Sequence, residues 1–554
     1  MATNKILIIF FLIAFSTFQA FSQQPTAPGK YWVEFTDKNF NDFSVDNPDE
    51  FLSAKSIQRR LSRGIAFDQK DLPVTQLYVD SLKSLGFEVY NTSKWLNGVS
   101  VSCENSELLD LLTGLSFVKT FVAKKSIKIE THDEKSLRVV DDFFSKSKNL
   151  YDYGMAEDQI TMLNGQHLHN QGYLGQGIDI AIIDAGFSNV DTISAFDSIW
   201  INNRVLGSWD FVLNQPIAFN KHSHGTNVFS IMAANLPGQF MGSAPSANYY
   251  LLRSEDGSSE YLVEEDYWLT AAEYADSVGV DIINTSLGYN TFDDNTQDHS
   301  YADMDGNTTR ISRGADIACS RGILVVVSAG NSGNSAWHYI TTPADADSVL
   351  TVGAVDSDRN YAAFSSTGPS ADGDVKPNVT AMGLGTYHIT GWGAVAFGNG
   401  TSFSAPLVCG LVACLWQANY TFSNMEIIDA IQKTSHKYNN PDSLMGYGIP
   451  NFALANFMLK QIDYDDLDSE NLINVYPSPF SDNFTVEIYS PDSQIMSISM
   501  HNAMGEKVYE KLVSASFSSY NIIKVDDIAG LKSGTYILRV STKKKTYKKK
   551  LIKT

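Results

Sequence analysis

The chain has 554 residues, which exceeds the usual length of one domain and can bury a large core. Its formal net charge of −21 argues against the class of basic nucleic-acid binders, so we expect no nucleic-acid partner. The four cysteines contain no Cys-x-x-Cys pair, and they indicate neither a disulfide framework nor a cysteine metal site.

Residues 1–22 have the organisation of a secretory signal peptide. Lys5 precedes an apolar run over residues 6–15, and Ala20-Phe21-Ser22 provides a small-residue exit. The run is too short to span a bilayer comfortably, although an uncleaved anchor is the alternative. No later stretch is apolar for long enough to cross a membrane. We therefore expect export, with a soluble mature protein.

Residues 23–130 are predicted to contain a small α+β unit. Its strands are expected at 31–35, 87–91, 98–102 and 118–122, and its helices at 50–61, 77–85 and 106–113. Residues 124–148 are strongly charged, and we assign 131–150 to an exposed linker. Proteolytic nicking concentrates in such linkers.

Residues 151–460 alternate between apolar strands and helices. Near-continuous apolar strands of this kind predict an α/β domain with a parallel sheet covered on both faces. Ligands bind beyond the carboxyl ends of such strands. Asp184, the loop after Ser286 and the turn at 328–331 all lie at predicted strand ends, so we expect them to converge. The expected strands are 178–183, 249–253, 281–286, 322–328 and 348–355.

A candidate nucleophile lies within residues 397–420. Gly398 and Gly400 precede Thr401-Ser402, and a long apolar run of helical length follows. Ser402 is therefore expected at the start of a buried helix, where the helix dipole and unpaired N–H groups favour developing negative charge. Pro406 is expected close enough to the first turn to be tolerated.

A serine nucleophile needs a base, a group that orients the base, and an oxyanion donor. His224 directly precedes a helix of small residues, Asp184 ends a strand, and the amide of Asn331 occupies a strand-to-loop turn. Each residue alone has an ordinary structural explanation as a cap, core or turn residue. Their combination favours nucleophilic catalysis.

Together these motifs resemble those of the subtilisin-family (subtilase, S8-type) serine proteases. IAIIDAGF around Asp184, HSHGTNV around His224 and GNGTSFSAP around Ser402 match in the family's order. The resemblance covers roughly residues 151–457 and implies a subtilisin-like parallel sheet with helices on both faces. Three connecting segments also match: NTSLG at 284–288, VVVSAGN at 325–331 and TPADADSVLTVGAVD at 342–356.

The resemblance implies a role for each site residue. Ser402 is the expected nucleophile, His224 the general base and acid, and Asp184 the group that orients His224. Asn331 and the Ser402 backbone N–H are expected to stabilise the oxyanion, and Thr341 to form the pocket floor. No cofactor is required for this chemistry. Two segments are expected to bind the peptide as an added strand and to wall its pocket: Ser286, Leu287 and Gly288, and Ser328, Ala329 and Gly330.

Three further features lie near these motifs. His222 and Ser404 are close to the site, but the Gly-Thr-Ser register selects Ser402. An acidic stretch at 293–307 offers hard oxygen ligands, so a structural calcium ion is possible. A solvated surface loop is the favoured alternative, because the spacing does not fit the twelve-residue calcium loop.

Both flanking units have their own resemblances. The unit at 30–123 resembles the subtilase inhibitory propeptide, an expected intramolecular inhibitor, with a permanent accessory domain as the alternative. Residues 471–554 are rich in short strands and predict a β-sandwich. They resemble the C-terminal sorting domain of the Bacteroidetes type IX secretion system, with a carbohydrate- or surface-binding module as the alternative. The matching segments are VYPSPFSDNFTVEI, MHNAMGEKVYE and LKSGTYILRV.

The sequence therefore predicts a secreted or cell-surface serine endopeptidase that is made as an autoinhibited preproprotein. Its expected partners are polypeptide substrates, its own propeptide and the type IX secretion machinery. An inactive subtilase scaffold is disfavoured by the intact set of four site residues. An esterase is disfavoured because both substrate-strand segments are present.

Overall fold

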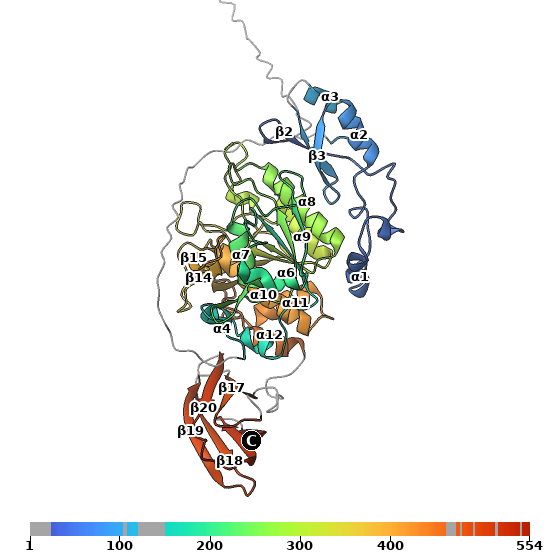
Figure 1. Ribbon diagram of the computed structural model, residues 1–554. Helices are drawn as coiled ribbons and strands as arrows, with labels where there is room; N and C mark the ends of the chain where they lie inside the picture. The colour runs from blue at the N-terminus through green and yellow to red at the C-terminus, as the bar shows by residue number, and fades with distance from the viewer. Residues whose placement is uncertain are drawn as a thin grey trace, which may run out of the picture.

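The computed structural model describes residues 24–103, 108–119, 150–460, 473–476, 479–490, 494–515, 519–542 and 546–554. The predicted signal peptide at 1–22 and most of the predicted linker lie outside these residues. Figure 1 shows three units in chain order, with the central one the largest.

The N-terminal unit is a four-stranded antiparallel sheet with helices on it, which confirms the predicted α+β class. Its fourth strand is Gln24–Ala27, which was not predicted, whereas most of the strand predicted at 118–122 lies outside the described residues. Val33, Leu82, Val99 and Leu112 belong to its core. The strand order is β1 (Gln24–Ala27), β2 (Lys30–Glu34), β4 (Gly98–Ser102), β3 (Glu88–Ser93), and the helices of this core are α2 (Gln76–Ser84) and α3 (Leu109–Leu112).

One helix of this unit lies apart from its sheet. The segment predicted as one helix at 50–61 divides into a 3₁₀ turn (Pro48–Glu50) and α1 (Ala54–Ser62). The division occurs because the Ser53 side chain accepts the N–H of Ser56 and caps the second helix. In Figure 1, α1 lies beside the central unit.

The central unit contains a seven-stranded parallel sheet, which confirms the predicted fold class. The apolar runs at Asp179–Asp184, Ile282–Thr285 and Leu324–Ser328 form its fully buried middle. The strand order is β13 (Val379–Met382), β12 (Leu350–Val355), β11 (Leu324–Ser328), β10 (Ile282–Thr285), β5 (Asp179–Asp184), β9 (Asn248–Arg253), β6 (Val205–Asp210).

Helices cover both faces of this sheet. On β5, Ile180 and Ile182 pack into the core that contains α7 (His224–Ala233) and α10 (Thr401–Ala418), because alternate side chains of a strand face opposite sides. Ala181 and Ile183 pack into the core with α8 (Val263–Val278) and α9 (Arg310–Ser320). The remaining α-helices are α4 (Glu157–Met162), α5 (Gln166–Asn170), α6 (Asp197–Ile201), α11 (Asn424–Lys433) and α12 (Phe452–Leu459), and two 3₁₀ turns lie at Ser194–Phe196 and Tyr301–Asp303. Two hairpins pair β7 (Asn235–Leu236) with β8 (Phe240–Met241) and β14 (Leu384–Ile389) with β15 (Val395–Asn399).

Helix α10 runs through the centre of the molecule. It is long and apolar enough to span a membrane, so the expectation that no later stretch has this length was wrong, but 89% of the helix is buried inside the protein. It is therefore a core helix, and its second residue is Ser402.

The C-terminal unit is a sandwich of two antiparallel sheets. Val486 and Val525 of one sheet share a core with Ile498 and Leu538 of the other, as the sequence predicted. Phe457 of α12 joins this core, so the sandwich packs against the central unit (Figure 1). The sheets are β16 (Ile473–Tyr476), β17 (Phe484–Ser490), β20 (Ser519–Val525), and β19 (Lys507–Ala515), β18 (Gln494–His501), β21 (Gly534–Ser541), β22 (Thr546–Lys553).

Candidate active site

Asp184 and His224 form a hydrogen-bonded pair at the carboxyl edge of the sheet. Asp184 ends β5 and is fully buried, whereas the His224 side chain, at the start of α7, is 24% exposed. The Asp184 Oδ1 atom lies 2.8 Å from His224 Nδ1 and also accepts the N–H of Ala185. A carboxylate only accepts, so the imidazole proton resides on Nδ1 and Nε2 carries the lone pair.

Ser402 and Asn331 border one space beside Gly400. The Asn331 Oδ1 atom accepts hydrogen bonds from the Thr401 N–H (2.8 Å) and hydroxyl (3.0 Å), which fix the direction of its amide. A methyl group added at Gly400 would lie 2.8 Å from Ser402 Oγ and 3.8 Å from Asn331 Nδ2. The hydroxyl and the amide donor are therefore held within reach of a common group.

Pro406 does not lie where the sequence predicted, and its position explains a hydrogen bond of Ser286. It is the sixth residue of α10, beyond the first turn, so the prediction that it lies close to the first turn was wrong. Proline has no N–H to donate to the carbonyl four residues earlier, which is that of Ser402. The Ser286 hydroxyl donates to this carbonyl instead, at 3.1 Å.

Ser286 thus has a role that the sequence reasoning missed. It was expected among the substrate-binding residues, yet its hydroxyl points to α10 and itself accepts from Asn284 Nδ2 at 3.2 Å. The proline four residues after Ser402 was the available signal, because it leaves a buried carbonyl that needs another donor.

The two expected wall segments meet at Thr341. This residue is 4% exposed. A methyl group added at Gly288 would lie 2.2 Å from its Oγ1 atom, and one added at Gly330 would lie 3.0 Å from it. The side chains of Leu287 and Ala329 are buried beside these glycines. The structure therefore brings together the expected pocket floor and both walls.

The backbones of the two wall segments differ in their hydrogen bonds. Ala329 donates to the Val352 carbonyl, and Gly330 donates to the Thr401 hydroxyl and accepts from Ser366. Among residues 150–460, by contrast, no partner bonds to the backbone of Leu287 or Gly288. The backbone of Leu287 and Gly288 can therefore pair with an added strand, whereas the backbone of Ala329 and Gly330 is already paired within the protein.

The two residues close to the motifs have structural contacts. His222 Nδ1 accepts the N–H of His224 at 3.1 Å, at the start of α7. Ser404 is fully buried, and its hydroxyl donates to the Thr401 carbonyl at 3.0 Å. The buried Ser404 hydroxyl is therefore satisfied within its own helix.

The acidic stretch at 293–307 does not gather into a metal-ligand set. Asp298 accepts the N–H of Phe292, and Asp305 accepts those of Asn307 and Thr308, so both carboxylates organise the loop. In the described part of the chain, three carboxylates approach one another elsewhere, at Asp347, Asp372 and Asp374, and all are exposed. Calcium also binds backbone and amide oxygens, so a structural calcium ion stays a prediction.

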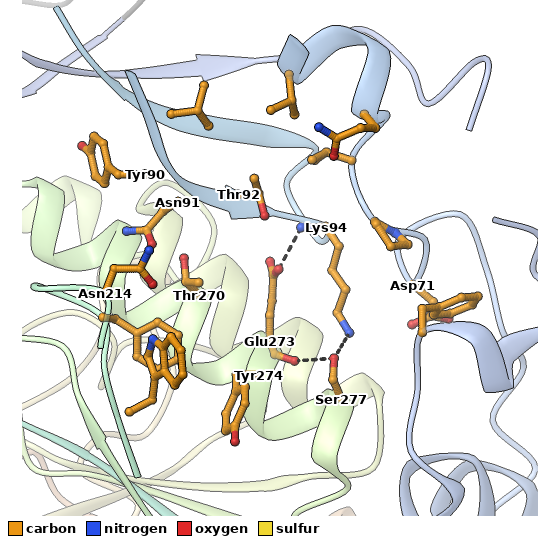
Figure 2. Close-up of a pocket in the computed structure, with 18 of the residues that line it drawn as sticks. Asp71, Tyr90, Asn91, Thr92, Lys94, Asn214, Thr270, Glu273, Tyr274 and Ser277 are labelled. Atoms are coloured by element: carbon orange, nitrogen blue, oxygen red, sulfur yellow. Dashed lines mark hydrogen bonds between the residues drawn. The ribbon is translucent and has the colours of Figure 1, made fainter. Parts of the chain in front are cut away.

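The N-terminal unit docks on α8 of the central unit. Figure 2 shows Lys94, which follows β3, above Glu273 and Ser277 of α8. These residues line a cavity of about 540 Å³. The Lys94 N–H donates to Glu273, and its ammonium lies 2.9 Å from both Asp276 Oδ2 and Ser277 Oγ. Burial raises the pKa of Glu273 to about 7, against the charge of Lys94.

Helix α1 binds the same central unit through buried arginines. Arg59 lies 2.6 Å from Asp276, and Arg60 bridges Asp276 (2.8 Å) and Asp71 (2.5 Å). Burial opposes the charge of Asp276, but Lys94, Arg60 and Arg59 together hold its pKa well below the usual range. This interface is therefore built from matched buried charges.

Comparison with known proteins agrees with this geometry. The model of the subtilase family matches residues 175–448. The chain is 31% identical over 301 residues to subtilisin E of Bacillus subtilis, covering 53% of this chain and 70% of that protein. It is 30% identical over 281 residues to subtilisin DY of Bacillus licheniformis, covering 50% of this chain and 90% of that protein. The chain belongs to the subtilase family.

The comparisons also identify both flanking units. A Bacteroidota peptidase S8 propeptide domain matches residues 30–138, and a secretion-system C-terminal sorting domain matches 474–554. This subtilase is thus a serine peptidase with a propeptide and a sorting tail, which indicates export to the cell surface or the medium. Among solved structures, MycP1 with its propeptide removed is 21% identical with a TM-score of 0.42, covering 54% of this chain and 96% of that one.

Proposed function

We propose that the protein is an endopeptidase that hydrolyses polypeptides through an acyl-enzyme, with Ser402, His224 and Asp184 as its triad. The observation that carries this proposal is the 2.8 Å contact between Asp184 Oδ1 and His224 Nδ1, which leaves Nε2 as a base beside the start of α10. A scaffold that only binds peptides has no need of this buried carboxylate–imidazole pair.

The reaction follows from these positions. Ser402 Oγ attacks the peptide carbonyl carbon while His224 Nε2 takes its proton, and the buried Asp184 stabilises the imidazolium. The oxyanion accepts hydrogen bonds from Asn331 Nδ2 and the Ser402 N–H. The carbon–nitrogen bond then breaks as His224 protonates the leaving amine, and water releases the acyl group by the reverse steps. No cofactor takes part in these steps.

The peptide is proposed to lie along Ser286, Leu287 and Gly288, with one side chain in the pocket that ends at Thr341. The unused backbone groups of Leu287 and Gly288 support strand pairing. Ser328, Ala329 and Gly330 form the opposite wall. A threonine floor favours small or medium apolar side chains over large basic ones in this pocket.

We propose a matching division of the chain. Residues 1–22 are the signal peptide, 23–130 the inhibitory propeptide, 131–150 a linker cut on maturation, 151–460 the peptidase, and 471–554 the tail that engages the type IX secretion machinery. N-terminal sequencing of the secreted protein should begin between residues 125 and 151. A start near Gln23 contradicts the propeptide role.

The experiment that tests the activity is fluorophosphonate labelling of the secreted protein, mapped by mass spectrometry. We expect label on Ser402, and loss of both label and casein hydrolysis in the Ser402→Ala variant. Ser404→Ala is the matched control, because it removes a neighbouring hydroxyl that bonds only within its helix. Correctly processed protein that takes no label would favour the inactive scaffold.

A further inference from the structure

An acidic loop borders the active-site edge on the side away from Asn331. The sheet order places β9 next to β5, whereas β11, which leads to Asn331, lies beyond β10. Directly after β9, the N–H of Ser254 donates to the Asp184 carbonyl at 3.1 Å. A methyl group at Gly257 would lie 3.4 Å from the His222 ring. The loop at 254–260 therefore lies beside Asp184 and beside His222, two residues before His224.

Three glutamates come together along this loop and the start of α8. The Tyr289 hydroxyl, one residue after the proposed substrate segment, donates to Glu255 Oε1 at 3.0 Å. The Asp256 N–H donates to Glu264 Oε1 at 2.9 Å. Burial raises the pKa of Glu255 to about 7, and the charge of Asp184 adds to this shift. Burial also raises the pKa of Glu260 to about 8 and that of Glu264 to about 10, and repulsion from Glu255 adds to both shifts.

One carboxylate oxygen of this cluster is buried without a partner. Glu264 is 2% exposed, and within the described residues its Oε2 atom makes no hydrogen bond. A buried acceptor in this state is costly unless a donor arrives from outside. The neighbouring Arg253 does not supply one, because its guanidinium contacts both oxygens of Asp210, at 3.0 and 2.9 Å, and the Ala185 carbonyl.

The propeptide already directs a cation toward these carboxylates. Lys30 of β2 donates to the Tyr267 hydroxyl at 2.6 Å and lies 5.4 Å from the centre of that ring. Burial lowers the pKa of Lys30, and the charges of Asp256 and Glu264 oppose this effect. Removal of the propeptide takes this ammonium away and leaves the acidic cluster open to another cation, whose charge favours the ionised form of these glutamates.

We infer that Glu255 and Glu264 form a specificity subsite for a lysine or arginine side chain of the substrate, upstream of the scissile bond. This inference rests on the proposed peptidase function. The residue that supplies the scissile carbonyl places its side chain at Thr341, between the segments after β10 and β11. Side chains of an extended peptide alternate in direction, so an upstream residue faces across the segment at 286–288 toward Tyr289 and Glu255. Its charged nitrogen donates to the unpaired Glu264 oxygen.

The test uses the mature enzyme and a series of internally quenched peptides. At each of the three positions upstream of the pocket residue, the peptides carry lysine, arginine, norleucine or glutamate. We expect kcat/KM for lysine to exceed that for norleucine by about tenfold at one position, the size of a charge-assisted hydrogen bond. The ratio should fall toward one in Glu264→Gln and in Glu255→Gln, and Glu255→Lys should favour glutamate at the same position.

The control is Asp429→Asn, which makes the same change in net charge on α11. Asp429 is exposed and pairs with Lys433 of its own helix, so the lysine-to-norleucine ratio should stay unchanged. Active-site titration with fluorophosphonate corrects each rate for misfolded enzyme. If no peptide is hydrolysed, the proposed function fails and the subsite with it. Hydrolysis without a cation preference, or with a preference that survives both glutamine variants, overturns the subsite alone.

Discussion

The active-site edge and the propeptide interface both bury carboxylates, but they treat them differently. At the interface, Asp276 meets three basic side chains, from Arg59, Arg60 and Lys94. At the active site, Asp184 has one imidazole partner, and its Oδ2 atom makes no hydrogen bond within the described residues. The first arrangement is saturated with counter-charge, and the second is not.

This difference indicates what each region is built to do. Matched buried charges hold two surfaces in one geometry, although their formation costs desolvation. An under-satisfied carboxylate at a site can instead stabilise a charge that develops during the reaction, such as the imidazolium of His224. The counter-charges at the interface come from the propeptide, so its removal would leave Asp276 with no partner from α1 or from Lys94.

Among variants that test this difference between the two regions, Asp184→Asn should have the largest effect. The amide no longer fixes the Nδ1–H tautomer or balances the imidazolium, so kcat should fall about 10⁴-fold, the loss known for a triad aspartate in serine proteases. The measurement is peptide hydrolysis by mature enzyme, with the folded fraction checked by circular dichroism. A loss below tenfold would mean that another group orients His224.

At the interface, Arg60→Ala should have the next largest effect. It leaves buried Asp71 and Asp276 with fewer counter-charges, so the precursor should lose about 3–5 kcal/mol of stability. Urea denaturation of the precursor, made inactive by Ser402→Ala, measures this change. Lys70→Ala, an exposed propeptide change, is the control and should stay within about 0.5 kcal/mol. Equal effects of the two variants would contradict a saturated buried network.

A smaller effect is expected at the carbonyl of Ser402, a buried acceptor that lies at the active-site edge and has the Ser286 hydroxyl as its donor. Ser286→Ala removes its donor and should lower kcat about fivefold, near 1 kcal/mol, with little change in KM. Pro406→Ala restores a helical N–H for the same carbonyl. Kinetics of the double variant should therefore show recovered kcat. Absence of recovery would assign Ser286 to the substrate instead.

Much of the fold and of the candidate site could be predicted, because a parallel sheet brings the carboxyl ends of its strands to one edge. The runs before Asp184, Ser286 and Asn331 are apolar and buried on both faces, so their polar ends had to meet at one edge. Strand β6 was missed because it is mostly half-exposed and Gly207 weakens its pattern.

The charged clusters could not be predicted in this way. Arg59 and Arg60 read as ordinary basic residues in the last turn of a helix, and Glu264 as an ordinary acidic residue in the first turn of α8. Their burial depends on which unit packs against that turn. This is a tertiary contact between segments more than two hundred residues apart, as between Arg60 and Asp276, and no local pattern records it.

The smallest expected effect is a pH dependence of propeptide release, set by Glu273. Its pKa is about 7 in the complex, against an ordinary value of 4.5 that exposure would restore after release. The complex therefore binds more protons than its separated parts, and propeptide affinity should fall as pH rises from about 5 to 7, by less than tenfold per unit. The pH effect of Asp276, whose pKa is lowered, has the opposite sign, but Asp276 loses its stabilising charge only in stronger acid.

Dissociation of the propeptide from the nicked Ser402→Ala precursor should follow this trend with pH, and Glu273→Gln should flatten it. A slope that survives in Glu273→Gln would assign the titration to another group.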